Sequence, residues 1–567
     1  MWKHLFAGGI FKLEQQNAAS KRLILSVLNS TATKREAKDY LTKYKSDSNA
    51  INHCFLLIRR PNAMKTKHIS QLAETIKRLR MLGLRPMFVI PPSHNIYKQA
   101  EILDIVITVA GLRPLHLNNA LSKSVSGKYT SILESQRFLF NDPKFDVIPI
   151  IKPYIYKEKN ATENLAPDEI LYLEHLSQGN IPHIDKFFII NNIGGIPSDE
   201  RKKNAHVFVN LSQEYIGLTS NLSNKVRSLA KKENNSASII GNLNRESDEL
   251  MINSLHDKYK EHLLDLQLMN TVLSNLSSTS TGLITTIDAA LLSSDKKNPL
   301  VYNLLTDRSL ISSSLPRFKQ QTKKIHSFDS KERYELYSEF REKSVEYETK
   351  YNINPTLVTT VLKKGVDIKN FDFPILNEYN SIGLPPGLVC KNITEYTGTS
   401  EKVDLVKIKS ILDQSFGKSL DLCHYLNRIN GSIASIIVIG DYEGIAILTH
   451  EGPQSNTFVY LDKFAVTPKL KGCLGISDII FNLMFKKFPK ELLWRSRRDN
   501  IVNKWYFQRS VGVLDLSMDL GIGNKKESQF KLFYSGDSET SQKSFRDIKR
   551  LQEYSTHVRD IQPSWEK

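Results

Sequence analysis

The sequence predicts two folded units: an α/β unit with a mostly parallel sheet and helices on both faces, followed by an α+β unit. The chain has 567 residues, which exceeds the roughly 100–200 residues of one domain. Its first part alternates short apolar runs with stretches of helical periodicity, which is typical of buried parallel strands and their covering helices. Its last third begins with a helix and a hairpin pattern and then alternates helices and strands, which favours an α+β order.

The first unit is predicted at residues 18–365. Its apolar runs do not alternate with polar residues, so each strand needs cover on both faces. Residues 219–255 are rich in Asn, Ser, Lys and Glu and predict an exposed, mobile insertion. The charged residues 319–350 predict a linker or a long surface helix. The predicted strands are 54–58, 86–90, 186–192, 278–286 and 357–362, and the predicted helices are 20–41, 69–82 and 259–277.

The second unit is predicted at residues 390–560, after the turn signal Pro385-Pro386-Gly387. Residues 440–443 separate two apolar runs and predict a β-hairpin. The predicted strands are 434–439, 444–449, 458–466, 492–494 and 530–534, and the predicted helices are 403–426, 477–488 and 502–509.

Composition excludes several classes of function. The net charge is +18, but Lys and Arg are spread along the chain without a nucleic-acid-binding signature, so we expect no nucleic-acid partner. Anionic ligands and a mitochondrial address are the alternative explanations. No apolar run approaches roughly 18 residues, so no membrane insertion is expected. The four cysteines lie far apart without a C-x-x-C pair, which indicates neither a disulfide framework nor a metal site.

Residues 1–17 have the character of a short mitochondrial presequence. They combine apolar and basic residues, with no acidic residue before Glu14. A secretory signal would need a longer apolar core. The alternative is a frayed terminus, because the stretch is not rich in Arg and Ser.

A basic loop near the C-terminus predicts a phosphate site. The strand at 458–466 leads into a loop that carries Lys469, Lys471, Gly472 and Gly475 and that precedes a helix. Free N–H groups at the start of a helix bind pyrophosphate. An ordinary strand–helix turn is the alternative, because the spacing is not a Walker or dinucleotide fingerprint.

A pair of arginines on the next strand predicts a site for carboxylates. Arg495 and Arg497 are two residues apart, so both side chains point to one face of a strand. Each guanidinium can grip a carboxylate with two hydrogen bonds, and a dicarboxylic amino acid supplies two. Asn500 and Tyr506 follow within reach of the same edge, and a phenol there can donate a proton. The alternative is ordinary surface charge on an edge strand.

These stretches resemble a known family. Residues 460–466, 493–497 and 503–507 resemble the C-terminal GNAT-type acetyltransferase domain of mitochondrial N-acetylglutamate synthases, most closely the fungal type. Residues 191–195, 298–307 and 312–316 resemble the α/β amino-acid-kinase-like domain of the same enzymes. The resemblance spans nearly the whole chain after the presequence.

The resemblance implies acetyl transfer from acetyl-CoA to the α-amino group of L-glutamate, the first step of arginine biosynthesis, in the mitochondrial matrix. By position, Lys463, Arg495 and Arg497 are the expected glutamate-binding cations, with Asn500 beside them. Tyr506 and Asn500 are the expected catalytic residues, with Tyr506 as the acid that protonates the leaving thiolate. The expected acetyl-CoA residues are Phe464, Ala465 and Val466, whose backbone N–H groups would steady the oxyanion, and Lys469, Lys471, Gly472 and Gly475.

The sequence departs from the family pattern at two places. In the phosphate loop, Leu474 stands at the second small position and Gly475 comes one residue later. In the first unit, the first strand runs into Arg59-Arg60 without a glycine pair and a phosphate-holding lysine, so we predict no kinase activity. The resemblance instead implies a regulatory unit that binds L-arginine as an inhibitor, supports homo-oligomers and takes part in a complex with acetylglutamate kinase. The alternatives are an acetylglutamate kinase and a non-catalytic regulatory subunit.

Overall fold

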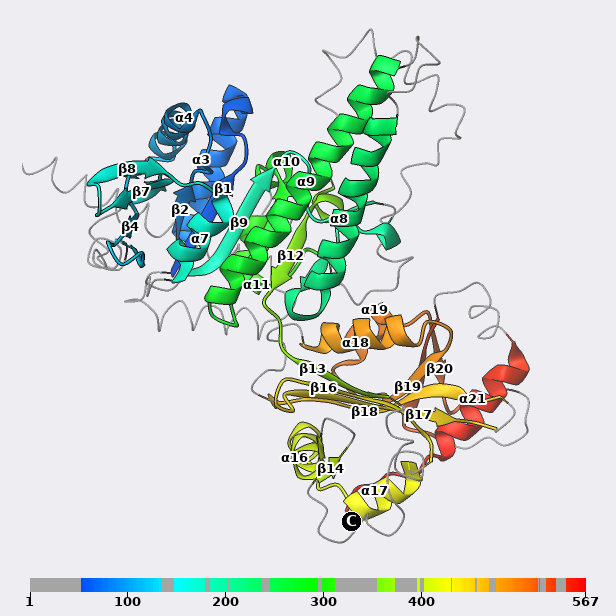
Figure 1. Cartoon of the computed structure of the whole chain (residues 1–567). Helices are drawn as coiled ribbons and strands as arrows, with labels where there is room; N and C mark the ends of the chain where they lie inside the picture. The colour runs from blue at the N-terminus through cyan, green and yellow to red at the C-terminus, as the bar shows by residue number, and fades with distance from the viewer. Residues whose placement is uncertain are drawn as a thin grey trace, which may run out of the picture. The chain divides into compact units, whose positions relative to one another are not determined.

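The chain forms two compact units, and the boundary between them falls between Gly365 and Val366 (Figure 1). We analysed a computed structural model. The structure describes residues 52–131, 133, 147–178, 184–201, 203–235, 245–293, 298–311, 354–372, 395–397, 402–429, 431–453, 456–468, 476–518, 520, 527–536 and 547–566. The predicted helix at 20–41, the presequence and the segment 319–350 lie outside these residues.

The first unit contains an eight-stranded sheet in the order β10-β12-β11-β9-β1-β2-β6-β3. All neighbouring strands are parallel except β11 and β12. Its strands are β1 (Asn52–Ile58), β2 (Leu84–Val89), β3 (Arg113–Leu117), β6 (Val147–Ile151), β9 (Ile184–Asn191), β10 (Phe208–Asn210), β11 (Thr281–Thr286) and β12 (Thr360–Lys363). A smaller sheet contains β4 (Leu121–Lys123), β5 (Tyr129–Ser131), β7 (Tyr154–Lys157) and β8 (Thr162–Leu165).

Helices cover both faces of the large sheet, which explains why its strands are apolar without alternation. On β1, Cys54 and Leu56 belong to one buried cluster, whereas Phe55 and Leu57 belong to the other. The first cluster is covered by α3 (Thr66–Met81), α4 (Ile96–Val109), α10 (Ile287–Ala290) and α11 (Pro299–Thr306), and the second by α7 (Glu169–Gln178), α8 (Leu211–Asn235) and α9 (Arg245–Asn275). The predicted α/β class of this unit is confirmed.

Two of the predicted elements in this unit are wrong in detail. Helices α8 and α9 form most of the segment 219–255, where we expected an exposed, mobile insertion. Its described side chains are exposed or half-buried except Leu222, which is buried in the second cluster. The two helices pack together, and the second half of α9 packs on the sheet through Leu266, Met269 and Leu273. The strand expected at 357–362 begins only at Thr360, because Asn354 caps the short helix α14 (Pro355–Val358).

Buried His262 of α9 gives the first unit a pH-dependent stability. Burial, with a smaller effect from Lys258, lowers the pKa of His262 to about 3 from its ordinary 6.5. Below pH 6.5 the His262 imidazole is therefore protonated in the unfolded chain but stays neutral in the folded chain. The unfolding free energy thus decreases as the pH falls. We expect the unfolding free energy to fall by up to about 1.4 kcal/mol per pH unit from this group. Urea titrations at pH 7 and pH 5 should show a smaller decrease of the unfolding free energy in His262→Leu than in the parent protein. An equal decrease in both proteins would contradict this assignment.

The second unit contains a seven-stranded sheet in the order β13-β16-β17-β18-β19-β21-β20. Its neighbours are antiparallel except β18 and β19. The strands are β13 (Ile368–Asp372), β16 (Ile433–Ile439), β17 (Gly444–Glu451), β18 (Phe458–Val466), β19 (Leu492–Arg497), β20 (Gly512–Asp515) and β21 (Phe530–Ser535). Because β13 pairs with β16, this unit includes residues ahead of 390, where we had expected it to begin.

Helices lie on both sides of this sheet as well. In Figure 1, α18 (Ile476–Lys487) and α19 (Asn503–Arg509) lie on one side, and α16 (Leu405–Phe416), α17 (Leu422–Ile429) and α21 (Ile548–Asp560) lie on the other. A short ribbon of β14 (Glu395–Thr397) and β15 (Lys402–Asp404) precedes α16. The single helix expected at 403–426 is divided, because Gly417 adopts a left-handed conformation with φ +66° and ends α16.

The described residues were also searched for membrane-spanning helices, metal sites and paired cysteines. Within them, no helix is long and apolar enough to cross a membrane, and no group of His, Cys, Asp and Glu could hold a metal ion. Cys54 is a buried free thiol, whereas Cys423 is disulfide-bonded. The spacing of the cysteines gave no indication of that bond.

Candidate active site

The parallel strands β18 and β19 pair over a short length and then separate. Pairing covers Val459 to Leu461 of β18 and Leu492 to Trp494 of β19. Both strands continue beyond these residues, β18 to Val466 and β19 to Arg497, with outer partners β17 and β21. Residues Lys463–Val466 therefore have no described strand on their β19 side. We call this stretch the open edge.

Backbone groups of Phe464 and Val466 point toward the open side. The Thr467 N–H donates to the Glu443 carbonyl beside β17, at 3.0 Å. Because backbone groups of successive residues in a strand point to opposite edges, those of Phe464 and Val466 point away from β17. The open edge thus offers backbone N–H donors to a ligand.

A β-bulge sets the direction of the Lys463 side chain. Leu461 pairs with Leu448 and Lys463 pairs with Ile447, so Asp462 is the extra residue. The bulge places Lys463 on the same face as Tyr460, where its Nζ lies 4.6 Å from the centre of the Tyr425 ring of α17. Strict alternation would have turned Lys463 to the opposite face.

Asp462 is a buried carboxylate held by cations. Lys463 Nζ donates to it at 2.8 Å, and Arg428 of α17 forms an ion pair with its other oxygen. Burial alone would raise the pKa of Asp462, but the charges of Lys463 and Arg428 bring it below its usual value. The carboxylate therefore stays ionised at neutral pH and fixes the bulge.

The three expected glutamate-binding cations share a face but have different partners. Arg495 donates to the carbonyls of Val558 and Ile561 at the end of α21, at 2.6 and 2.9 Å. Arg497 is exposed and forms two hydrogen bonds with Asp499, at 3.0 and 2.9 Å. Lys463 and Arg495 thus belong to the α17–α21 side of the sheet, as the alternation of β19 predicts for the two arginines.

Tyr506 and Asn500 lie on the other side. The Tyr506 ring packs against Trp494 and Phe533, with ring centres 5.9 and 5.4 Å away. Asn500 donates to Ser496 Oγ at 2.9 Å. Since Trp494 and Ser496 alternate with the two arginines, Asn500 and Tyr506 contact the same strand as the arginines but lie on its opposite face.

Tyr506 is nevertheless close to the open edge through one aromatic neighbour. Phe481 of α18 contacts Phe464 of the open edge at 5.2 Å between ring centres and contacts Tyr506 at 5.9 Å. Burial raises the pKa of Tyr506 well above its ordinary value. Tyr506 is therefore a neutral phenol at physiological pH. None of the described residues provides a hydrogen-bond partner for its hydroxyl.

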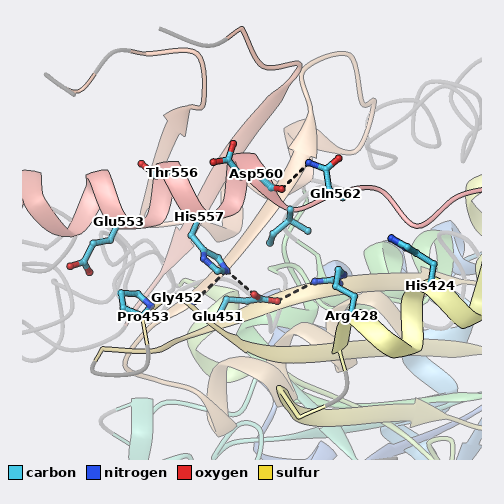
Figure 2. A pocket seen from close by; sticks show the side chains of 11 residues that line it. His424, Arg428, Glu451, Gly452, Pro453, Glu553, Thr556, His557, Asp560 and Gln562 are labelled. Carbon is cyan, nitrogen blue, oxygen red and sulfur yellow. Dashed lines mark hydrogen bonds and ion pairs between the residues drawn. The ribbon is translucent and has the colours of Figure 1, made fainter. Parts of the chain in front are cut away.

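A pocket of about 750 Å³ lies on the α17–α21 side. Figure 2 shows Glu451 at its base, joined to Arg428 and to His557. The distances are 3.3 Å from Arg428 Nη1 and 2.8 Å from His557 Nε2. Arg428 connects this pocket to Asp462 and so to the start of the open edge. The pocket is also lined by His424, Gly452, Pro453, Glu553, Thr556, Asp560, Ile561 and Gln562.

Sequence reasoning missed Asp462, Arg428 and the end of α21. An acid inside an otherwise apolar strand was the available signal for Asp462, since a buried charge requires a partner. The expected phosphate-loop residues Lys469, Lys471, Gly472 and Gly475 lie outside the described residues. Ala465 packs in the core beside α16 and α17, so its side chain serves the fold.

Known proteins match this chain over its full length. A family model for the NAT domain, the N-acetyltransferase of N-acetylglutamate synthase, matches residues 394–561. The mitochondrial amino-acid acetyltransferase of Vanderwaltozyma polyspora is 57% identical over 100% of both chains. That of Saccharomyces cerevisiae S288c is 56% identical over 100% of this chain and 99% of its own. The chain belongs to the mitochondrial amino-acid acetyltransferases.

A solved structure was also matched. It is the crystal structure of N-acetylglutamate synthase from Neisseria gonorrhoeae complexed with coenzyme A and L-arginine. It is 10% identical and covers 88% of this chain and 98% of its own, with a TM-score of 0.34.

Membership of this family confirms several expectations. The enzyme is an amino-acid N-acetyltransferase of the N-acetylglutamate synthase type, and acetyl-CoA is its co-substrate. The mitochondrial location is confirmed by the names of the relatives. The GNAT assignment of the second unit is confirmed by the NAT match over residues 394–561.

Proposed function

We propose that the open edge holds the thioester of acetyl-CoA while L-glutamate approaches from the α17–α21 side. The observation that carries this proposal is the separation of β18 and β19 beyond Leu461 and Trp494. It frees the backbone N–H groups of Phe464 and Val466, which can donate to the thioester carbonyl and to the oxyanion that forms from it. A thioester at this edge would lie between the Tyr506 side and the cation side of the sheet.

Residues after the open edge fit the phosphates of acetyl-CoA. The segment from Lys469 to Gly475 supplies two lysines and two glycines, and helix α18 begins at Ile476 directly after it. The first N–H groups of a helix and its positive dipole end favour pyrophosphate. We therefore assign Lys469, Lys471, Gly472 and Gly475 to pyrophosphate binding.

Lys463, Arg495 and Arg497 are assigned to the two carboxylates of glutamate. Arg497 is exposed, and its partner Asp499 is an exposed side chain that a substrate carboxylate can replace. Arg495 and Lys463 are held by carbonyls and by Asp462. Their directions are therefore set before substrate binds, which lowers the cost of ordering them.

The reaction follows from this placement. The neutral α-amine of glutamate attacks the thioester carbon directly, and the tetrahedral intermediate expels the coenzyme A thiolate. Tyr506 donates the proton that the thiolate accepts. The amine loses one proton to water as the amide forms, and water returns a proton to the Tyr506 phenolate. This route needs no enzyme-bound acetyl group, so Cys473 is a loop residue rather than a nucleophile. Asn500, which is bonded to Ser496, supports the turn before α19.

The first unit is proposed to be regulatory. At the carboxyl ends of β1 and β9, Arg59 is bound by Glu169 and Asp265, so a guanidinium fixed by two carboxylates stands where a kinase needs a free phosphate-binding group. This supports the absence of kinase activity. We propose that this unit binds L-arginine as a feedback inhibitor. We also propose that the chain forms a homo-oligomer and takes part in a complex with acetylglutamate kinase. We further propose a presequence at 1–17 and a regulatory unit at 18–365. The acetyltransferase unit, which the sequence predicted at 390–560, extends from β13 at Ile368 to the residues after α21.

The test is thiol release from acetyl-CoA by the purified enzyme, with and without glutamate and arginine. We expect glutamate-dependent release that arginine slows. Arg497→Ala should raise the KM for glutamate roughly 10-fold or more, the effect of losing one charge-assisted hydrogen-bonded pair, with a smaller change in kcat. The matched control is Arg498→Ala, whose side chain binds Asp515 and Ser517 instead. No thiol release would overturn the proposal, and equal KM values in both variants would overturn the role of Arg497.

A further inference from the structure

The chain crosses the α17–α21 side of the second unit after α21 ends. We call residues Ile561–Glu566 the C-terminal strap. Backbone hydrogen bonds tie it to the turn between α16 and α17: the Asp421 N–H donates to the Ser564 carbonyl at 3.0 Å, and the Glu566 N–H donates to the Ser419 carbonyl at 2.9 Å. The side chain of Ser564 is buried and bonded to His424, 3.1 Å away. The strap is therefore a fixed part of this unit.

One end of the strap holds Arg495. The Val558 and Ile561 carbonyls accept hydrogen bonds from the two Nη atoms of Arg495. The last carbonyls of a helix have no partner within it and carry its negative dipole end, so a guanidinium is stabilised there. The Phe530 ring lies 4.7 Å from the guanidinium carbon. The end of α21 and the start of the strap thus fix the position of this cation.

The other end of the strap reaches Lys463. The Trp565 ring lies 5.8 Å from Lys463 Nζ, and the Tyr425 ring lies 4.6 Å from it. Trp565 packs against Phe416 of α16, with ring centres 4.9 Å apart, and pairs with Leu420 as an isolated bridge. Two aromatic faces therefore restrict where the ammonium group can lie.

We propose that the C-terminal strap positions the acceptor amino acid, with Trp565 as its main positioning residue. The inference rests on the proposed function, in which Lys463 and Arg495 bind the glutamate carboxylates. These cations come from two different strands that separate, so β18 and β19 do not fix the spacing between the two charges. The strap contacts both cations and sets that spacing. Its loss should weaken glutamate binding without affecting the acetyl-CoA side.

The experiment compares Trp565→Leu with Trp565→Phe in the full-length enzyme. Leucine keeps apolar bulk against Phe416 but has no aromatic face, whereas phenylalanine keeps one. We expect Trp565→Leu to raise the KM for glutamate roughly 3- to 30-fold, the range of one cation–π contact, with kcat and the KM for acetyl-CoA within about 2-fold. Trp565→Phe should restore most of the glutamate KM. The control Lys407→Gln changes a residue of α16 outside the strap that is paired with Asp441 and should behave like the parent enzyme.

Two outcomes would overturn the inference. One is an unchanged KM for glutamate in Trp565→Leu. The other is a change of similar size in the KM for glutamate, the KM for acetyl-CoA and kcat in Trp565→Leu, with the same changes present in Trp565→Phe. Lys463→Met separates this failure from failure of the proposed function. If Lys463→Met leaves the glutamate KM unchanged, the assignment of Lys463 is wrong. If it raises that KM while Trp565→Leu does not, the strap inference alone fails.

Discussion

Tyr506→Phe is expected to lower kcat by roughly 10²–10⁴, the usual contribution of a general acid, while the KM for glutamate changes little. The substitution removes one hydroxyl and keeps the ring between Trp494 and Phe533. Because the described residues give that hydroxyl no hydrogen-bond partner, its removal should not lower the melting temperature. Burial keeps the pKa of Tyr506 high, so the phenol is still protonated at the moment when the leaving thiolate takes up a proton. Steady-state kinetics with a thermal melt would measure both quantities.

A second buried tyrosine provides the control for this experiment. The Tyr554 hydroxyl of α21 is bonded to Glu491 and to Arg550, on the side of the sheet away from Tyr506. Tyr554→Phe should therefore lower the melting temperature and leave kcat near that of the parent. An unchanged kcat in Tyr506→Phe would show that another group or water protonates the thiolate.

Arg59→Leu is expected to destabilise the first unit by about 3–5 kcal/mol, the cost of removing one member of a buried ion cluster. The side chains of Arg59, Glu169 and Asp265 are 8%, 10% and 0% exposed. Arg59 donates two hydrogen bonds to Asp265 and one to Glu169. Leucine would leave two buried carboxylates facing each other without a cation. Urea denaturation that follows the transition of the first unit would measure the change.

The neighbouring arginine is the matched control. Arg60 is paired with Glu261, but its side chain is 62% exposed. Exposed pairs contribute about 0–1 kcal/mol, so Arg60→Leu should have a small effect. Similar losses in both variants would show that the cluster around Arg59 is not what stabilises the ends of β1 and β9.

The order of helices and strands could be predicted from the sequence where side-chain periodicity was strong. The uninterrupted apolar run of β1 predicted a strand covered on both faces, and its residues divide between two buried clusters. The segment 219–255 was misjudged because its own residues are mostly polar, although they belong to two long helices. The second half of α9, which lies after this segment, buries Leu266, Met269 and Leu273 in the second cluster. The composition of the segment alone does not show that anchoring.

The candidate site could be predicted as a set of residues but not as an arrangement. Alternation along β19 correctly placed Arg495 and Arg497 on one face. The same rule puts Ser496 and Trp494, and with them Asn500 and Tyr506, on the opposite face. The bulge at Asp462 could not be foreseen, because a bulge depends on the partner strand as well as on its own residues.

The sequence alone determined the fold classes, the enzyme family and the residue types of the site, because those depend on local periodicity and on motifs that stay together in the chain. The tertiary structure decided which side of the sheet each group occupies and what holds it there. The separation of β18 from β19, the ion pairs of Asp462 and the strap from Ile561 to Glu566 all join segments that are distant in sequence. Such contacts form only when the strands and helices pack, so no pattern within one segment encodes them.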